Sequence, residues 1–268
     1  MSAPVMALTE AAAEAGIDAA CRALHLPTVR EEAGTLADAA AKQQLTHRGY
    51  LAEVLIAEVD ERDSRRRARR LIEARFPRLK RLEDFDLAGA PGVNPASLAA
   101  LGRGGFIDAG EPVVLIGDSG TGKSHLLIGL GVAACEAGRR VRYVTCASLV
   151  NELAEAADDR VLSKVVARYG RLELLLVDEL GYVSVDPRGA ELLFQVLTER
   201  EERASVAVAS NQPFSEWGRT FADPRLAAAV VDRLTFNAHI IETGTDSYRL
   251  RTARTKRANR RSTTEETP

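Results

Sequence analysis

The run Gly-Asp-Ser-Gly-Thr-Gly-Lys-Ser at residues 117–124 limits the possible folds of this chain more than any other feature. It fits the phosphate-binding loop pattern G-x-x-x-x-G-K-[ST], which follows a buried strand and opens a helix. The apolar run 112–116 precedes it, and an apolar segment that starts at His125 follows it. An ordinary glycine turn before a helix does not require this spacing, so we expect the chain to bind a nucleotide.

Each residue type in this run has a role in holding phosphate. Glycines let the backbone curl until its N–H groups face an anion, and the start of the following helix adds its positive dipole end. Lys123 is expected to reach the β- and γ-phosphates, and the Ser124 hydroxyl is expected to ligate Mg²⁺. The predicted nucleotide-binding residues are Gly117, Asp118, Ser119, Gly120, Thr121, Gly122, Lys123, Ser124 and His125.

A second run, Leu-Glu-Leu-Leu-Leu-Val-Asp-Glu at residues 172–179, places two carboxylates at the end of a predicted buried strand. Ligands of open α/β sheets bind at that edge. Asp178 is expected to hold Mg²⁺, and Glu179 to orient the attacking water. The alternative is a strand that ends in a charged turn. A second acid beside the metal aspartate favours hydrolysis over phosphoryl transfer to a small substrate, and the chain has no Asn-Lys-x-Asp run for reading guanine.

Two further positions stay open on spacing alone. Asn211 follows the next predicted strand, where a polar side chain acts either as a γ-phosphate sensor or as a helix cap. Arg233 stands late in a predicted helix, where it could complete the ATP site of a neighbouring subunit. Its alternative is a surface arginine paired with Asp232 or Glu242, and Arg225 is a rival for the catalytic role.

Strands and helices alternate through the second part of the chain, which predicts an α/β fold. The expected strands are 112–117, 140–145, 172–178, 205–210 and 238–242. The expected helices are 123–137, 148–158, 187–203 and 224–235. Continuously apolar strands are buried on both faces, so we expect a parallel sheet between two helical layers. Gly129 and Gly131 inside the first of these helices indicate that it packs closely against the sheet.

The charge distribution points to a polyanionic partner. Residues 62–81 hold ten Arg or Lys against two acids, and residues 249–261 hold seven against none, although the net charge of the chain is only −2. Two basic segments flanking an acidic body are typical of nucleic-acid binding. The arginines expected to contact DNA phosphates are Arg65, Arg66, Arg69 and Arg70, with a solvated helix face as the alternative.

Three regions follow from these patterns. Residues 1–82 are expected to form a helical domain that carries the basic helix, 83–250 an ATPase domain, and 251–268 a basic disordered tail. The chain has no apolar run long enough for a membrane and no secretory signal at its start. Its three scattered cysteines fit reduced thiols. We therefore expect a cytoplasmic protein.

Several motifs in order resemble the IstB-like ATP-binding proteins, which assist insertion-sequence transposases. They are GDSGTGKSHL, LLLVDELGY, ELLFQVLTER, ASNQPFSEWG, DPRLAAAVVDRL and SYRLR. That family belongs to the AAA+ ATPases and is similar to the DnaC helicase loader. By this resemblance Asn211 takes the sensor role, Arg233 becomes the arginine finger, and Phe85 in LEDFDL lies at the entry of the adenine pocket.

The resemblance implies an ATP-dependent homo-oligomer that grips duplex DNA and delivers it to a cognate transposase. Only about 25 residues follow the last predicted strand, so we expect no C-terminal lid domain and assign no lid arginine role to Arg249. A helicase loader is the first alternative. A small-molecule phosphotransferase and a non-catalytic, nucleotide-gated scaffold are the others, and Glu179 argues against both.

Overall fold

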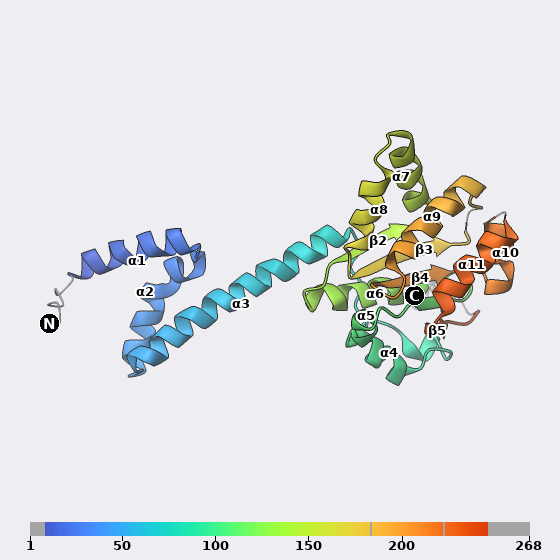
Figure 1. Ribbon diagram of the computed structural model, residues 1–268. Coiled ribbons are helices and arrows are strands. Elements are labelled where there is room, and N and C mark those ends of the chain that lie inside the picture. Colours follow the sequence, from blue (N-terminus) through green and yellow to red (C-terminus); the bar gives the residue numbers. More distant parts are fainter. Residues whose placement is uncertain (1–8, 183, 222, 246–268) are drawn as a thin grey trace, which may run out of the picture. The chain divides into compact units, whose positions relative to one another are not determined.

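The computed structural model describes residues 9–182, 184–221 and 223–245 and divides into two compact units (Figure 1). The first unit ends at Ala68 and the second begins at Arg69, so the division falls within helix α3 (His47–Ala74). The predicted tail and the SYRLR motif lie outside the described residues. Within the described part of the chain, no helix is both long and apolar enough to cross a membrane.

The first unit is helical, as predicted. In its described part, α1 (Glu10–Leu24) packs against α2 (Pro27–Lys42), and side chains of the first part of α3 form hydrogen bonds with both. Thr9 is the N-cap of α1, and its hydroxyl accepts the N–H of Ala12. Helix α2 begins with a proline in its first turn. The buried apolar side chains of this unit are small, Val54 being the largest of them.

The start of α2 is capped by a side chain from α3. The buried carboxylate of Glu58 accepts the backbone N–H groups of Thr28 at 2.8 Å and Val29 at 3.1 Å. Arg62, one turn further along α3, donates to Glu58 at 3.0 Å and to the carbonyl of His25 at the end of α1. Burial disfavours the charged carboxylate, but these backbone and Arg62 hydrogen bonds outweigh it and hold the pKa of Glu58 below its usual value.

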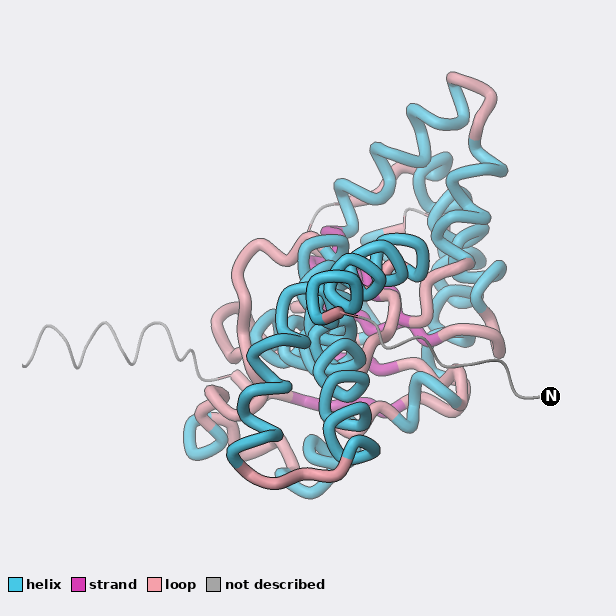
Figure 2. The backbone as a smooth tube through the Cα atoms, turned by 90° about the vertical axis from the view of Figure 1, so that its left-hand side faces the viewer, coloured by secondary structure: helices cyan, strands magenta, loops and turns pink. Residues whose placement is uncertain are grey.

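The second unit is built on a five-stranded parallel sheet in the order β2-β3-β4-β1-β5. The strands, magenta in Figure 2, are β1 (Val113–Ile116), β2 (Val141–Thr145), β3 (Leu174–Leu180), β4 (Ser205–Ser210) and β5 (His239–Glu242). Each was predicted within two residues. The expected α/β class with a parallel sheet is therefore confirmed.

Successive side chains of each strand enter different hydrophobic cores, because neighbouring residues of a strand face opposite sides. In β3, Leu174 and Leu176 join the core formed with α6 (Lys123–Glu136), while Leu175 and Val177 join the core on the other face. The latter core contains residues of α7 (Cys146–Asp158), α8 (Leu162–Gly170), α9 (Pro187–Arg200) and α11 (Pro224–Thr235). The two helical layers are visible above and below the sheet in Figure 1.

Helix α8 and the short helices before β1 were not predicted. The segment between α3 and β1 contains α4 (Pro95–Gly102) and α5 (Gly105–Asp108). Its signal was present, since Asn94 caps α4 through two backbone N–H groups and Pro95 takes the first helical position. The remaining short elements are η1 (Leu87–Gly89), η2 (Phe214–Glu216) and α10 (Trp217–Thr220).

The two glycines inside α6 mark close approaches, and their partners differ. A β-carbon at Gly131 would lie 2.4 Å from Cδ1 of Leu176 in β3, so this glycine lets α6 approach the sheet as predicted. A β-carbon at Gly129 would instead lie 2.7 Å from Cδ2 of Leu82, in the segment that follows α3. Of the two glycines, Gly131 therefore has the predicted partner, the sheet, and Gly129 does not.

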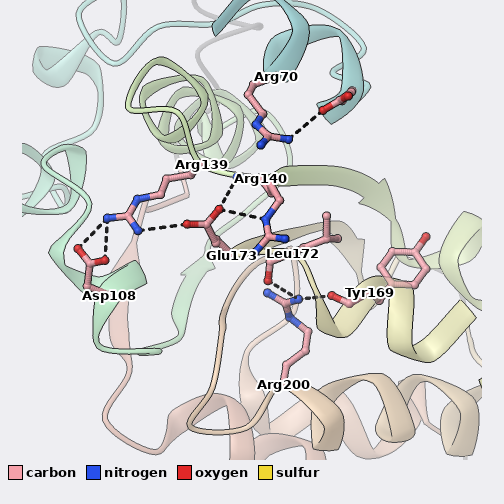
Figure 3. Close-up of polar contacts among 9 residues, drawn as sticks. Arg70, Asp108, Arg139, Arg140, Tyr169, Leu172, Glu173 and Arg200 are labelled. Atoms are coloured by element: carbon pink, nitrogen blue, oxygen red, sulfur yellow. Dashed lines mark hydrogen bonds and ion pairs between the residues drawn. The ribbon is translucent and has the colours of Figure 1, made fainter. Parts of the chain in front are cut away.

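The edge where the strands begin is held by arginines (Figure 3). The Glu173 carboxylate accepts from Arg139 at 3.2 Å and from the backbone N–H of Arg140 at 2.9 Å. Arg200 is buried and donates to three backbone carbonyls, at Tyr169, Leu172 and Ser205. Burial lowers the pKa of Arg200 to about 10, so it remains charged at neutral pH.

We predict that Glu58→Gln destabilises the first unit by about 1–3 kcal/mol at neutral pH, because a charged acceptor of backbone N–H groups is replaced by a neutral one. The folded pKa is lowered, so this stabilisation is present above the unfolded pKa and is lost as pH falls through the folded one. Hydrogen exchange of the α1 and α2 amides, followed from about pH 7 to 3, measures both effects.

Glu61→Gln is the matched control, because Glu61 lies on the same helix in a half-exposed pair with Arg65. Its effect should stay within about 0.5 kcal/mol. Equal effects of the two substitutions would contradict the capping role of Glu58.

Candidate nucleotide site

The loop between β1 and α6 has the backbone of a phosphate cradle. Gly120 and Gly122 have φ angles of 88° and 101°, which L side chains rarely adopt. A β-carbon at Gly122 would lie 2.6 Å from Cε2 of Phe85, and one at Gly117 would lie 2.3 Å from Oγ1 of Thr243. Packing therefore requires glycine at positions 117 and 122, and backbone conformation favours it at positions 120 and 122.

The cradle is held in place by the segment that follows β5. The N–H of Asp118 donates to the carbonyl of Gly244 at 3.0 Å, and the hydroxyls of Thr121 and Thr243 lie 2.6 Å apart. The N–H of Thr243 in turn donates to Ile116 at the end of β1. Sequence reasoning missed Thr243 and Gly244, because no spacing signal links residues more than 120 positions apart.

Lys123 opens α6 and is folded onto the loop. Its Nζ donates to the carbonyls of Gly117 at 2.6 Å and Asp118 at 2.7 Å, and the side chain is largely buried. Ser124 follows it in the first turn of the helix. The ammonium group thus lies within the loop that would surround a phosphate, beside the N–H groups of the helix start.

The Asp178 carboxylate is fixed on both oxygens. It is only 4% exposed, and Oδ1 accepts the backbone N–H of Glu179 at 2.9 Å. Oδ2 accepts the hydroxyl of Tyr143, on the neighbouring strand β2, at 2.9 Å. Burial and then the Asp178 charge raise the pKa of Tyr143, so its hydroxyl stays protonated as the donor.

Glu179 sits in an irregular part of β3. The pairing of β3 with β4 shifts between Val177 and Leu180, and Glu179 has a φ of 61°. A non-glycine residue in the left-handed region costs of order 1–3 kcal/mol and is typical of functional sites. The residue is exposed, in contrast to the buried Asp178 beside it.

Strand β4 brings Asn211 between the phosphate loop and the carboxylates. Ser210, at the end of β4, pairs with Ile116 of β1 on one side and with Leu180 of β3 on the other. The buried Oδ1 of Asn211 has no hydrogen-bond partner within the protein. A buried amide oxygen without a partner is costly, and a hydrogen-bonded water or ligand at this position would satisfy it.

Phe85 lies against the loop. Its ring meets the side chain of His125 edge-on, with centroids 5.4 Å apart, and it faces the Cα of Gly122. The His125 ring is fixed by the carbonyl of Arg81 at 2.8 Å. The structure thus brings Phe85, His125 and the loop glycines together, as an apolar entry to the site would need.

Arg233 lies at the opposite edge of the sheet. Helix α11 ends at Thr235, just before the start of β5, whereas the loop follows the end of β1. The guanidinium binds Glu201 at 2.7 Å and Thr198 at 2.6 Å and lies over the ring of Phe194 at 4.2 Å. The surface-pair alternative named Asp232 or Glu242, and the partner is instead Glu201.

Arg225, the rival of Arg233, lies exposed in the first turn of α11, where its backbone N–H donates to the capping carboxylate of Asp223. The two arginines are therefore at opposite ends of one helix. Strand β1 has four residues and spans about 13 Å, which is the rough separation between the edge of the sheet near Arg233 and the edge that carries the loop.

The four arginines proposed to contact DNA lie on α3, and three of them form ion pairs with acidic residues of the same helix. Arg65 pairs with Glu61, while Arg69 and Arg70 share Glu73. Arg65, Arg66 and Arg69 are exposed, and Arg70 is largely covered. Exposed pairs of this kind contribute little and can be exchanged for other anions.

The residues present fit ATP with Mg²⁺. Packing leaves no space for a β-carbon at Gly117 or Gly122, the ammonium of Lys123 lies against the loop carbonyls, and the orphaned oxygen of Asn211 is buried after the neighbouring strand β4. A hydroxyl such as Ser124 and a carboxylate such as Asp178 are the hard oxygen ligands that Mg²⁺ prefers. Within the described ranges, no group of three or more His, Cys, Asp or Glu could form a dedicated metal site.

Comparison with known proteins agrees with this geometry. A family model described as IstB-like ATP binding protein matches residues 19–256. The putative ATP-binding protein of insertion sequence IS5376 from Geobacillus stearothermophilus is 33% identical over 234 residues, which cover 87% of this chain and 93% of that protein. Its counterpart in IS21 from Pseudomonas aeruginosa is 36% identical over 220 residues, 82% of this chain and 83% of that one.

The fold is similar to that of a replication initiator. AMPPCP-bound DnaA from Aquifex aeolicus aligns with a TM-score of 0.53 at 20% identity, over 63% of this chain and 50% of that chain. The expected resemblance and fold class are both confirmed. The chain belongs to the IstB-like ATP-binding protein family.

Proposed function

We propose that this ATPase assembles on duplex DNA with ATP and Mg²⁺ and assists a transposase in DNA transposition. The observation that carries the proposal is that Lys123 and Asp178 lie at one edge of the sheet and Arg233 at the other. A site whose arginine lies on the far edge requires a second subunit. The insertion-sequence context comes from the relatives in IS5376 and IS21.

In the proposed site, Lys123 moves from the loop carbonyls to the β- and γ-phosphates. Bound Mg²⁺, held by Ser124 and Asp178, would neutralise the charge that develops on the phosphate oxygens. Glu179 orients the attacking water, and the orphaned oxygen of Asn211 accepts a hydrogen bond from it. Phe85 contributes an apolar face for adenine.

The basic helix supplies the proposed DNA contact. Arg65, Arg66, Arg69 and Arg70 form two neighbouring stripes on α3, since residues four apart lie on one face. The helical domain proposed for residues 1–82 would therefore hold the phosphate backbone. Such contacts fix position without reading sequence.

Lys123→Ala should abolish ATP binding, because it removes the positive charge inside the cradle. Glu179→Gln should bind ATP like the parent and hydrolyse it roughly 10²–10⁴-fold more slowly, because the water loses its general base. Equilibrium binding of a fluorescent ATP analogue and steady-state phosphate release measure the two steps. Hydrolysis by Glu179→Gln at the parental rate would exclude the assigned role.

Arg233→Ala should bind ATP nearly normally and lose roughly 10³–10⁵-fold in turnover, because a finger acts on the transition state. Arg225→Ala, at the other end of α11, is the matched control and should have a mild effect. Mixing Arg233→Ala with Lys123→Ala should restore part of the activity. At some interfaces the intact loop of an Arg233→Ala subunit then meets the intact Arg233 of a Lys123→Ala subunit.

Mixed oligomers that form without regaining activity would contradict a finger acting in trans. Parental turnover by Arg233→Ala would do the same, and its contacts with Glu201 and Thr198 would then be structural.

Reversing the charge of Arg65, Arg66, Arg69 and Arg70 should weaken duplex binding for every sequence tested. Each lost phosphate contact lowers the slope of log affinity against log salt by about 0.9. Arg48→Glu, in the first turn of the same helix, is the control for a general charge effect. A slope that matches the control would remove the basic helix from DNA binding.

The transposase role is tested by co-purification with the transposase of the same insertion sequence, with DNA and a non-hydrolysable ATP analogue present. Capture of a replicative helicase in its place would favour the loader alternative.

A further inference from the structure

Tyr143 is placed between the end of the basic helix and the Asp178 carboxylate. It lies in β2, its hydroxyl donates to Oδ2 of Asp178 at 2.9 Å, and its ring lies 6.4 Å from the ring of Phe76 between centroids. Phe76 comes two residues after the last residue of α3. One side chain therefore contacts both the proposed metal ligand and the exit of the proposed DNA-binding helix.

The orientation of Asp178 depends on this hydroxyl. The other carboxylate oxygen is held by the N–H of Glu179, so the two hydrogen bonds together fix the plane of the carboxylate. Removing the Tyr143 hydroxyl leaves Asp178 attached only to its own neighbour in the chain. The carboxylate could then rotate, although its backbone would stay in place.

Three further contacts tie the end of α3 to the ATPase core. The thiol of Cys135 on α6 donates to the carbonyl of Arg70, and Arg142 in β2 donates to the carbonyl of Glu73 at 3.4 Å. A β-carbon at Gly131 would lie 2.8 Å from Cε1 of Phe76, so the Phe76 ring lies directly on α6. A displacement of this end of α3 would be transmitted to β2 and to α6, which carries Lys123.

The same end of α3 carries charges that an anion would reach. Arg69 and Arg70 share the single carboxylate of Glu73, which leaves an excess of positive charge six to seven residues before Phe76. Figure 3 shows Arg70 extending from the last turns of α3. A phosphate that displaces Glu73 would act on the segment that ends in the Phe76–Tyr143 contact.

We propose that Tyr143 is a positioning residue for Asp178, and that the contact series Phe76–Tyr143–Asp178 couples DNA at the end of α3 to the ATP site. This rests on the proposed function. Neither the phosphate loop pattern nor the paired acids assigns any role to Tyr143 or Phe76. The coupling runs through contacts between packed side chains, which is its physical basis.

Tyr143→Phe is the decisive variant, because it keeps the ring against Phe76 and removes only the hydroxyl. Tyr169→Phe is the matched control, since Tyr169 is also buried and donates to a carboxylate, Glu152, away from the site. Thermal unfolding of both variants checks that the fold is intact. Phe76→Leu tests the other end of the series by removing the aromatic contact.

The first measurement needs no DNA and no turnover. Affinity for a fluorescent ATP analogue is measured against Mg²⁺ concentration. Tyr143→Phe should require at least threefold more Mg²⁺ for half-maximal binding, while Tyr169→Phe should match the parent. An unchanged Mg²⁺ requirement in folded Tyr143→Phe would overturn the positioning role.

The second measurement is the coupling itself. Linkage requires that if DNA raises ATP affinity, ATP raises DNA affinity by the same factor. We expect AMPPCP to increase the affinity of the unsubstituted protein for duplex DNA. In Tyr143→Phe and Phe76→Leu the affinity for DNA without nucleotide should be retained, and AMPPCP should no longer increase it. A full rise in both variants would overturn the coupling.

Failure of the proposed function gives a different result. A parent that binds no duplex DNA would contradict both that function and the coupling, and the Mg²⁺ measurement would still decide the role of Tyr143 alone.

Discussion

The close approach of α6 to β3 is the constraint on which the ATP site depends. Gly131 brings the helix against Leu176, and the start of that helix carries Lys123 and Ser124. A larger residue at 131 would push back the helix whose N-terminus faces the phosphate. The Phe76 ring packs against the same glycine. Gly131 therefore affects both the position of α6 against the sheet and the position of the segment that follows α3.

The two edges of the sheet carry different kinds of residues. At the end of the strands lie glycines with positive φ, the exposed Glu179 and the unpartnered oxygen of Asn211. At the start of the strands, Glu173 and Arg200 satisfy backbone groups of several elements and hold the ends of α8 and α9. Arg233 lies at this second edge on a helix that packs against α9. A rigid edge of this kind is suited to presenting a side chain to another molecule at a fixed position.

Sequence patterns predicted the strands well because continuous apolar runs such as residues 174–177 have few alternatives to a buried strand. Helix α8 was missed because it is short and has no side-chain cap at its start. The clamp by Thr243 and Gly244 and the bond from Tyr143 to Asp178 depend on which strands become neighbours. Strand order is a property of the whole fold, so spacing along the chain contains no direct record of it.

Glu179 shows how the position of a carboxylate can be set by the backbone. Its left-handed φ carries a cost that a glycine would avoid, and Gly181, two residues later, has the same sign of φ without that cost. The pairing of β3 with β4 becomes irregular after Val177. The regular alternation of side chains between the two faces of the sheet is therefore interrupted at Glu179. Two adjacent acids in a strand would ordinarily face opposite sides of the sheet. The chain therefore accepts local strain so that consecutive side chains, one buried and one exposed, can leave the same strand end.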